Sequence, residues 1–259
     1  MRLSFASAPA TDSSTAKDAA QGAFQAPNDV RVAMVVEQMW QPVPGGSGTY
    51  ITNLAHSLRA QGVKVAGIAA RRSHNDPGSS AVGLETMPVR YANLPRPALY
   101  ESWNRLHSPL AEAILPASDL VHATTWAIPP TRKPLVVTVH DLAFLRNPEH
   151  FTKRGNSYFR KSLQRTIKEA QAVIVPSQAT ADDCYEAGID SERVHVIPHG
   201  VSVQEVSASQ IDLFRTAYGL SRPYVLWTGT REPRKNLPGL LHAFSRIAGE
   251  FPQLDLVLV

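Results

Sequence analysis

The segment Val30-Arg31-Val32-Ala33-Met34-Val35-Val36 decides the fold, together with the residues just after it. Its short run of apolar, mostly β-branched residues has the length and composition of a β-strand. A loop rich in proline and glycine comes next: Pro42, Pro44, Gly45, Gly46 and Gly48. Apolar residues at helical spacing then run from Ile51 to Leu58, Gly62 ends that helix, and Val63–Ile68 repeats the strand pattern. Strand, loop, helix and strand form the unit from which parallel sheets are built.

The alternation of strand and helix patterns continues along the chain. Further strands are predicted at Leu84–Val89, Leu120–His122, Leu135–Val139, Ala172–Val175 and Val194–Ile197. Helices are predicted at Leu99–Leu115, Tyr158–Glu169 and Ala179–Ala187, the last ended by Gly188. Leu135–Val139 is strongly apolar and β-branched, which predicts a central strand covered on both faces. The sequence therefore predicts an α/β fold, a Rossmann-like doubly wound parallel sheet.

A second, shorter unit of the same kind begins at Pro223. It consists of a strand at Tyr224–Trp227, a loop at Thr228–Asn236, a helix at Leu237–Phe251 and a strand at Leu254–Val259. The predicted domains are a disordered tail (1–29), a Rossmann-like domain (30–208), a linker with a helix at Ser209–Tyr218 (209–222), and an incomplete second Rossmann-like domain (223–259). Because pieces shorter than about 40 residues rarely fold alone, we expect the last one to pack on the first domain, stay disordered or belong to a longer parent.

Composition describes an ordinary globular protein and excludes several classes of partner. Of 259 residues, 43% are hydrophobic and 19% charged. A net charge of +4 is too small and dispersed for a nucleic-acid binder, and the basic residues are not interleaved with aromatic ones. A weakly basic face remains open to an anionic membrane or a phosphorylated ligand.

The cysteine content and the apolar runs of the sequence indicate a cellular location. Cys184 is the only cysteine, so no disulfide can form within the chain, and a reducing compartment fits. No apolar run reaches the roughly 18 residues of a membrane span, and the N-terminus lacks a signal-peptide pattern. We expect a cytoplasmic protein, with a peripheral place at the inner face of the membrane as an open alternative.

The first candidate site is the segment Gly45-Gly46-Ser47-Gly48-Thr49-Tyr50. Glycine lets backbone approach a ligand closely, and the free N–H groups of a following helix attract phosphate. The alternative is a turn that only joins a strand to a helix. Ile51 stands where a dinucleotide fingerprint has its third glycine, and no ribose-binding acid follows the second strand, which argues against a nicotinamide-dependent oxidoreductase.

The second candidate site is His140-Asp141, directly after the central strand. Ligands bind at the carboxyl ends of strands in open parallel sheets. An imidazole there can hydrogen-bond a sugar hydroxyl or stabilise developing charge, and Asp141 can orient it or cap the next turn. The alternative is a structural histidine whose hydrogen bonds are made within the protein at the strand end. The position of His140 at the carboxyl end of a strand favours the functional interpretation.

Two further strand ends carry polar residues. Ser177 follows Ala172–Val175 and is a good N-cap for the next helix, although it also lies at a carboxyl end. Pro198, His199 and Gly200 follow Val194–Ile197 and are interpreted mainly as residues that shape the domain junction. Ser177, His199 and Gly200 are kept as candidate cleft residues.

The last candidate is the cationic loop that holds Arg231, Arg234 and Lys235. Arg234 and Lys235 stand before a predicted helix, where the helix dipole disfavours cations unless an anion lies between them. A bound diphosphate would relieve that cost, with arginine as a bidentate fork and lysine as a point charge. A solvated basic loop is the alternative.

Together these motifs, in this order and spacing, resemble the GT-B glycosyltransferases, specifically the retaining group called family 4. The resemblance runs from about Val30 to Val259. It implies two Rossmann-like domains that face each other across a cleft, the first for the acceptor and the second for the nucleotide-sugar donor. It implies that Gly46 and Gly48 lie near the donor phosphates, that His140 touches the donor sugar, and that Arg234 and Lys235 hold the diphosphate.

The resemblance also implies that no metal or other cofactor is needed, because cations neutralise the leaving phosphate. Two features depart from the family. Thr230 stands where the family often has arginine, so either Arg231 or Arg234 must substitute. The family's paired glutamates would lie beyond Val259.

The implied function is transfer of a hexose, for example mannose, from a nucleotide-diphosphate sugar to a saccharide or lipid-linked acceptor with retention of configuration. The alternative is a non-catalytic fragment that at most binds acceptor or a partner. We expect the 259-residue chain alone to lack normal affinity for a nucleotide-sugar.

Overall fold

The computed structural model describes residues 29–41, 43–72, 87–201, 203 and 205–259. The chain divides into two compact units, residues 1–137 and 138–259, which are described in turn. A parallel sheet of seven strands follows the order β3-β2-β1-β4-β5-β6-β7. Its strands are β1 (Arg31–Val35), β2 (Lys64–Ala69), β3 (Val89–Tyr91), β4 (Leu120–Ala123), β5 (Leu135–Thr138), β6 (Ala172–Val175) and β7 (Val194–Val196). The sheet confirms the predicted Rossmann-like doubly wound fold, with β5 inside it as expected.

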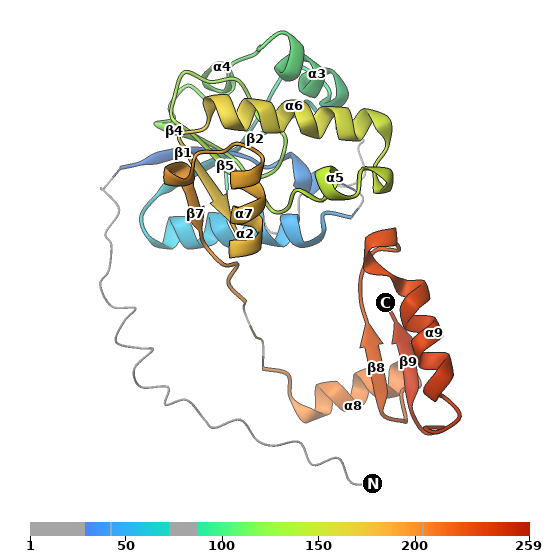
Figure 1. The fold of residues 1–259 in the computed structure, drawn as a ribbon. Coiled ribbons are helices and arrows are strands. Elements are labelled where there is room, and N and C mark those ends of the chain that lie inside the picture. The colour runs from blue at the N-terminus through green and yellow to red at the C-terminus, as the bar shows by residue number, and fades with distance from the viewer. Residues whose placement is uncertain (1–28, 42, 73–86, 202, 204) are drawn as a thin grey trace. The chain divides into compact units, whose positions relative to one another are not determined.

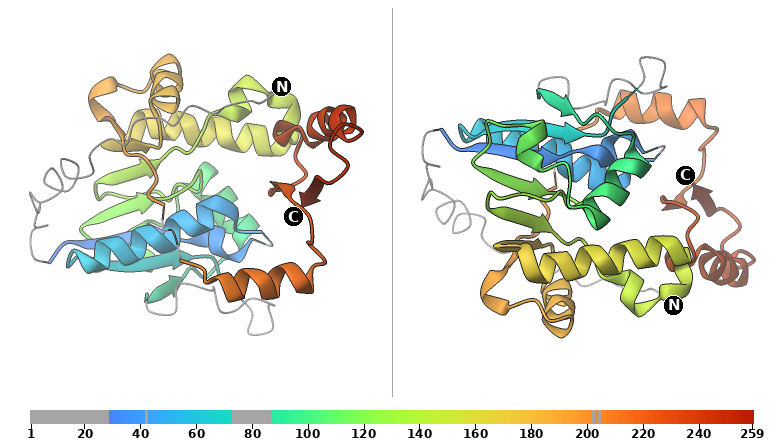
Figure 2. Two further views of the ribbon diagram at one scale, coloured as in Figure 1. Left: turned by 90° about the horizontal axis from the view of Figure 1, so that it is seen from below. Right: turned by 90° about the horizontal axis from the view of Figure 1, so that it is seen from above.

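The first unit is built around β1, whose neighbours are β2 on one side and β4 on the other. Helix α2 (Gly45–Ala60) buries Ile51 and Ala55 against the sheet residues Val32, Met34 and Val65. Helices α3 (Arg96–Arg105) and α4 (Ala111–Ile114) lie on the opposite face (Figures 1 and 2). The apolar stripe of α2 thus meets the alternating inward residues of β1, as the sequence periodicity requires.

Two predicted elements in this unit are wrong in their bounds. The helix predicted at Leu99–Leu115 is interrupted between Arg105 and Ala111, because Pro109 has no N–H to donate and its ring clashes with the preceding turn. The strand predicted at Leu84–Val89 lies largely outside the described residues, and the observed strand β3 begins only at Val89. Pro88 cannot donate to the ladder, but its carbonyl accepts the amide of Gly67 at 2.8 Å.

The second unit opens with short helices that the sequence did not predict, α5 (Ala143–Arg146) and η2 (Pro148–His150). Helix α6 (Lys153–Glu169) starts earlier than the predicted Tyr158, because Thr152 caps it through a 3.1 Å hydrogen bond from the amide of Gly155 to Oγ1. Helix α7 (Gln178–Glu186) and η3 (Ser191–Arg193) then link β6 to β7. The predicted strands around them are confirmed.

The C-terminal part of this unit contains helix α8 (Ala208–Ala217), which Ser207 and Gln210 begin with a capping box. Strands β8 (Tyr224–Trp227) and β9 (Asp255–Leu258) pair in parallel, and α9 (Leu237–Ile247) runs alongside them (Figure 1). The short helix η4 (Pro233–Lys235) lies inside the predicted loop. The predicted order of strand, loop, helix and strand is confirmed, although α9 ends at Ile247 rather than Phe251.

Candidate functional site

His140 lies where the sequence predicts it, just beyond the carboxyl end of β5. Val139 is fully buried and its amide donates to the carbonyl of Ile174 at 2.9 Å, which extends the sheet contact by one residue. His140 follows as the first polar side chain and is half-buried. The strand therefore delivers the imidazole to the edge where open parallel sheets bind ligands.

The structure places a second imidazole against the first. Nδ1 of His140 lies 3.3 Å from Nε2 of His199, and the rings meet edge to face with centroids 5.3 Å apart. Such a bond needs a proton on one nitrogen and a lone pair on the other, so at least one of the rings is neutral while the contact exists. His199 is exposed and follows β7.

His199 is interpreted from the sequence mainly as a residue that shapes the domain junction, and the structure in addition places it against His140. The amide of Ile197 donates to the carbonyl of Val175 at 2.8 Å and thereby fixes the exit of β7 beside β6. His199 is the second residue after Ile197. The available signal in the sequence was that both histidines follow strands of one parallel sheet.

Asp141 is exposed and caps the turn that starts α5. Its Oδ1 accepts the amide of Ala143 at 3.0 Å. Of the two roles considered for Asp141, this geometry supports the cap, which stabilises the chain direction immediately after His140.

The remaining candidate cleft residues differ in how the structure uses them. Ser177 is the N-cap of α7, and its Oγ accepts the amide of Thr180 at 3.2 Å. Gly200 is exposed, and a Cβ built there would meet no atom within 4 Å. Ser177 therefore has a defined structural task, whereas packing does not require glycine at position 200.

The glycine-rich segment is not the loop that the sequence predicts, because Gly45–Tyr50 already belongs to α2. Gly45 has a positive φ of 61°, which favours glycine at the entry to the helix. A Cβ on Gly48 would lie 2.5 Å from Cβ of Pro44, so close packing excludes a larger residue. Gly46 would meet nothing within 4 Å. Pro44, the cap residue, offers no side-chain acceptor to the first turn.

The cationic loop contains an acid, Glu232, that forms a hydrogen bond and an ion pair with Arg234. The Glu232 carboxylate accepts hydrogen bonds from Oγ1 of Thr230 and from Nε of Arg234, each at 2.6 Å. The Thr230 hydroxyl and then the Arg234 guanidinium lower the pKa of the Glu232 carboxyl below its ordinary value. Within the described residues, the side chains of Arg231 and Lys235 make no hydrogen bond or ion pair, although the charge of Lys235 also lowers the pKa of Glu232.

The helix that follows the loop begins at Asn236 rather than at a cation. Asn236 has left-handed backbone angles (φ 48°, ψ 40°), and its Oδ1 accepts the amide of Gly239 at 3.3 Å. The cap therefore satisfies part of the N-terminus of α9, while Arg234 and Lys235 lie in η4 just before it.

Glu37 is a buried acid that the sequence pattern does not reveal. It is 1% exposed, its Oε2 accepts the amide of Ala70 at 2.7 Å, and its Oε1 pairs with Arg72. The guanidinium of Arg72 also lies 4.9 Å from the ring centroid of Trp40. This pair ties the segment after β1 to the end of β2, beside the start of α2. A lone glutamate after a strand gives no sequence signal for burial.

The described ranges, residues 29–259 without 42, 73–86, 202 and 204, contain neither a metal-binding cluster nor a membrane-spanning helix. In them no three His, Cys, Asp or Glu side chains gather closely enough to hold a metal ion. No helix in the same ranges combines the length and apolar character that crossing a membrane requires.

Comparison with known proteins identifies a family whose model matches this chain. The model of Glycosyltransferase Family 4 matches residues 44–205, which include both histidines. The chain is 29% identical over 252 residues to alpha-maltose-1-phosphate synthase of Mycolicibacterium smegmatis, covering 88% of this chain and 60% of that protein. It is 32% identical over 126 residues to the Escherichia coli serotype-specific mannosyltransferase WbdA, covering 46% of this chain and 15% of that protein.

A solved structure supports the fold. Anabaena Alr3699/HepE in complex with UDP and glucose matches with a TM-score of 0.61 and 20% identity, covering 88% of this chain and 60% of that one. The chain thus spans about 60% of the length of the synthase and of the HepE chain.

Proposed function

Because the chain belongs to Glycosyltransferase Family 4, we propose that its protein transfers a hexose from a nucleotide-diphosphate sugar to a saccharide or lipid-linked acceptor, with retention of configuration. The observation that carries the proposal is the pair His140–His199 at the carboxyl edge of the sheet. Neutral imidazole nitrogens are suited to hydrogen-bond the hydroxyl groups of a sugar.

The proposed chemistry is a front-face displacement. The bond between the anomeric carbon and the diphosphate oxygen breaks, and its electron pair leaves with the diphosphate. The acceptor hydroxyl oxygen bonds to the anomeric carbon from the same face, and its proton passes to the leaving phosphate oxygen. His140 contributes by holding the donor sugar while charge develops, which is the kind of preorganised contact that lowers the barrier.

The leaving diphosphate needs positive charge, and we assign it to Arg231 and Lys235. Their side chains make no ion pair within the described residues, whereas Arg234 shares its guanidinium with Glu232. Because Arg231 and Lys235 supply positive charge, the proposed reaction requires no metal ion.

Mannose is the hexose we favour. WbdA, with which almost half of this chain aligns, is described as a mannosyltransferase. The HepE structure contains UDP and glucose, so glucose is the alternative that an assay must include.

A donor screen with product analysis tests the proposal. The complete protein that contains this chain is incubated with nucleotide-activated mannose and glucose, and the anomer of the product is read by NMR. His140→Ala should lower kcat about 100-fold or more, a loss typical of removing one transition-state contact. His56→Ala, an exposed histidine on α2, is the matched control and should retain activity. Full turnover of His140→Ala would remove the histidine from the mechanism, and an inverted product would overturn retention.

A further inference from the structure

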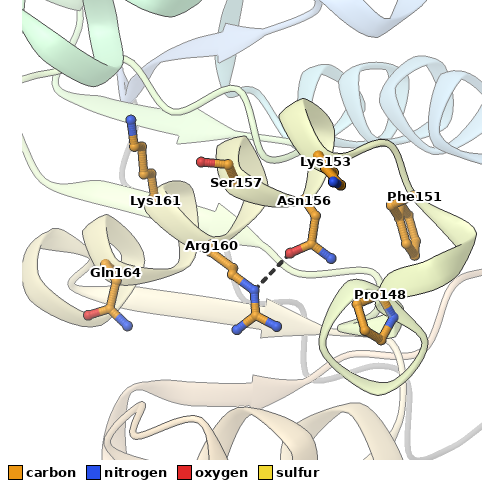
Figure 3. A pocket seen from close by; sticks show the side chains of 8 residues that line it. All are labelled: Pro148, Phe151, Lys153, Asn156, Ser157, Arg160, Lys161 and Gln164. Carbon is orange, nitrogen blue, oxygen red and sulfur yellow. Dashed lines mark hydrogen bonds between the residues drawn. The ribbon is translucent and has the colours of Figure 1, made fainter.

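A hollow of about 600 Å³ opens beside the first half of α6 and the turn that precedes it (Figure 3). Three of its lining residues are the cations Lys153, Arg160 and Lys161, and none is a carboxylate. Arg160 and Lys161, two of these lining residues, leave the helix in different directions in Figure 3. A recess with this charge is suited to an anion.

Arg160 is held in place by a buried amide. Its Nε donates to Oδ1 of Asn156 at 2.7 Å, while Nδ2 of Asn156 donates to the carbonyl of Phe144 at 2.8 Å (Figure 3 shows the first bond). Asn156 is only 9% exposed, so this anchor is rigid. Within the described residues the two terminal NH2 groups of Arg160 have no protein acceptor. The guanidinium therefore offers a preorganised two-pronged donor of the kind that binds phosphate.

The charges at the start of α6 point to the same kind of ligand. Lys153 and Arg154 occupy the first turn, which contains no acid. Cations at a helix N-terminus are disfavoured by the dipole, and a bound anion turns that cost into an attraction. The lining residue Lys153 and the fixed Arg160 thus independently favour a negatively charged group in the hollow.

We propose that this hollow binds a phosphate group carried by the acceptor. Helix α6 leads from β5 to its neighbour β6, so its N-terminus lies at the carboxyl edge of the sheet, the edge that also presents His140. The identity of the ligand as acceptor rests on the proposed function, whereas the binding of phosphate does not. The phosphate can belong to a soluble phosphorylated saccharide or to a lipid headgroup.

The first test is a titration of the 259-residue chain with inorganic phosphate, followed by NMR. Arg160→Gln should weaken binding about tenfold or more, since it removes a charged fork. Lys168→Gln, with the same loss of charge at the other end of α6, should stay within about twofold of wild type. Circular dichroism checks that each variant is folded. Equal affinity in wild type and Arg160→Gln would overturn the proposal.

The second test separates the two sources of phosphate. Vesicles of phosphatidylcholine, with and without phosphatidylglycerol, are sedimented with each variant. Binding to the anionic vesicles that is lost in Arg160→Gln supports a lipid headgroup, and binding of inorganic phosphate without vesicle binding supports a soluble phosphorylated acceptor. Binding of neither probe, or vesicle binding that does not depend on Arg160, would overturn it.

Failure of the proposed function has a different signature. If glycosyl transfer is absent but the hollow exists, Arg160→Gln still weakens phosphate binding, while neither the wild type nor any variant shows turnover. If transfer occurs without the hollow, His140→Ala removes turnover and phosphate affinity is the same with and without Arg160.

Discussion

His140 and His199 lie 59 positions apart in the sequence, yet Nδ1 of one is 3.3 Å from Nε2 of the other. They follow β5 and β7, which flank β6 in the sheet. Loops at the carboxyl edge of parallel strands gather in one place, so two residues that the sequence presents as separate strand ends form one pair.

This pairing makes His199 a positioning residue for His140. In the complete protein, His199→Ala should lower kcat about fivefold with little change in the KM for the donor, because the lost hydrogen bond is worth about 1 kcal/mol. His199→Gln, whose amide can both donate and accept, should recover most of the rate. Steady-state kinetics measure both. If the two variants lose equal activity, the hydrogen bond is not the cause.

The N-cap of α6 gives a prediction about stability. Thr152→Ala should lower the free energy of unfolding by about 1 kcal/mol, since the amide of Gly155 loses its acceptor. Thr152→Ser keeps the hydroxyl and should stay close to wild type. Urea denaturation followed by circular dichroism compares them. A loss that is the same in both variants would point to the missing methyl group instead.

The exposed ion pair of Arg31 and Asp119 leads to a prediction about how stability depends on pH. Hydrogen bonds from the side chain and then the backbone of Arg31 lower the pKa of the Asp119 carboxyl to about 2. The pKa of Asp119 in the folded protein lies below its ordinary value. The pair therefore stabilises the fold at pH values above the ordinary pKa, and this contribution is lost as the pH falls towards about 2.

NMR titration of the Asp119 carboxyl should therefore show its midpoint near 2 in wild type. In Arg31→Gln the midpoint should return towards the ordinary aspartate range. An unchanged midpoint in the variant would contradict the assignment of the shift to Arg31. Since both side chains are exposed, we expect the accompanying change in stability to be small.

Cys184 should be inert in the native protein. Its side chain is fully buried, and burial raises the pKa of the thiol to about 12. The reactive thiolate is therefore scarce up to high pH, and native labelling at pH values of about 7 to 9 should be far slower than labelling of a free cysteine. A colorimetric thiol reagent should label the chain fully only in denaturant. Rapid native labelling would show that the helix α7 opens readily.

Glu232 should restrain anion binding at its loop. In the complete protein, Glu232→Gln should strengthen binding of a nucleotide diphosphate several-fold, because the carboxylate no longer competes for Arg234. Arg231→Gln and Lys235→Gln should each weaken it about tenfold. Calorimetry ranks these three variants together with Arg234→Gln. If Arg234→Gln instead causes the largest loss, the pairing with Glu232 positions that arginine for the ligand.

The sequence by itself determined the alternation of strands and helices, because apolar periodicity is a local property that each segment carries alone. It placed β5 inside the sheet from its β-branched composition, and it placed His140 at a strand end. Pro109 was a readable break that the helical pattern around it obscured. The glycines at 45–48 were misassigned, since a loop and a first helical turn with positive φ have the same composition.

Only the tertiary structure decided which distant residues meet. The contact of His140 with His199, the burial of Glu37 against Ala70, and the anchoring of Arg160 through Asn156 to Phe144 all depend on how elements pack. A hydrogen bond depends on a few tenths of an ångström and on the direction of a lone pair. Periodicity specifies which face of an element is buried but carries no information at that scale, which is why the residue pattern predicts the sheet and not the contacts at its edge.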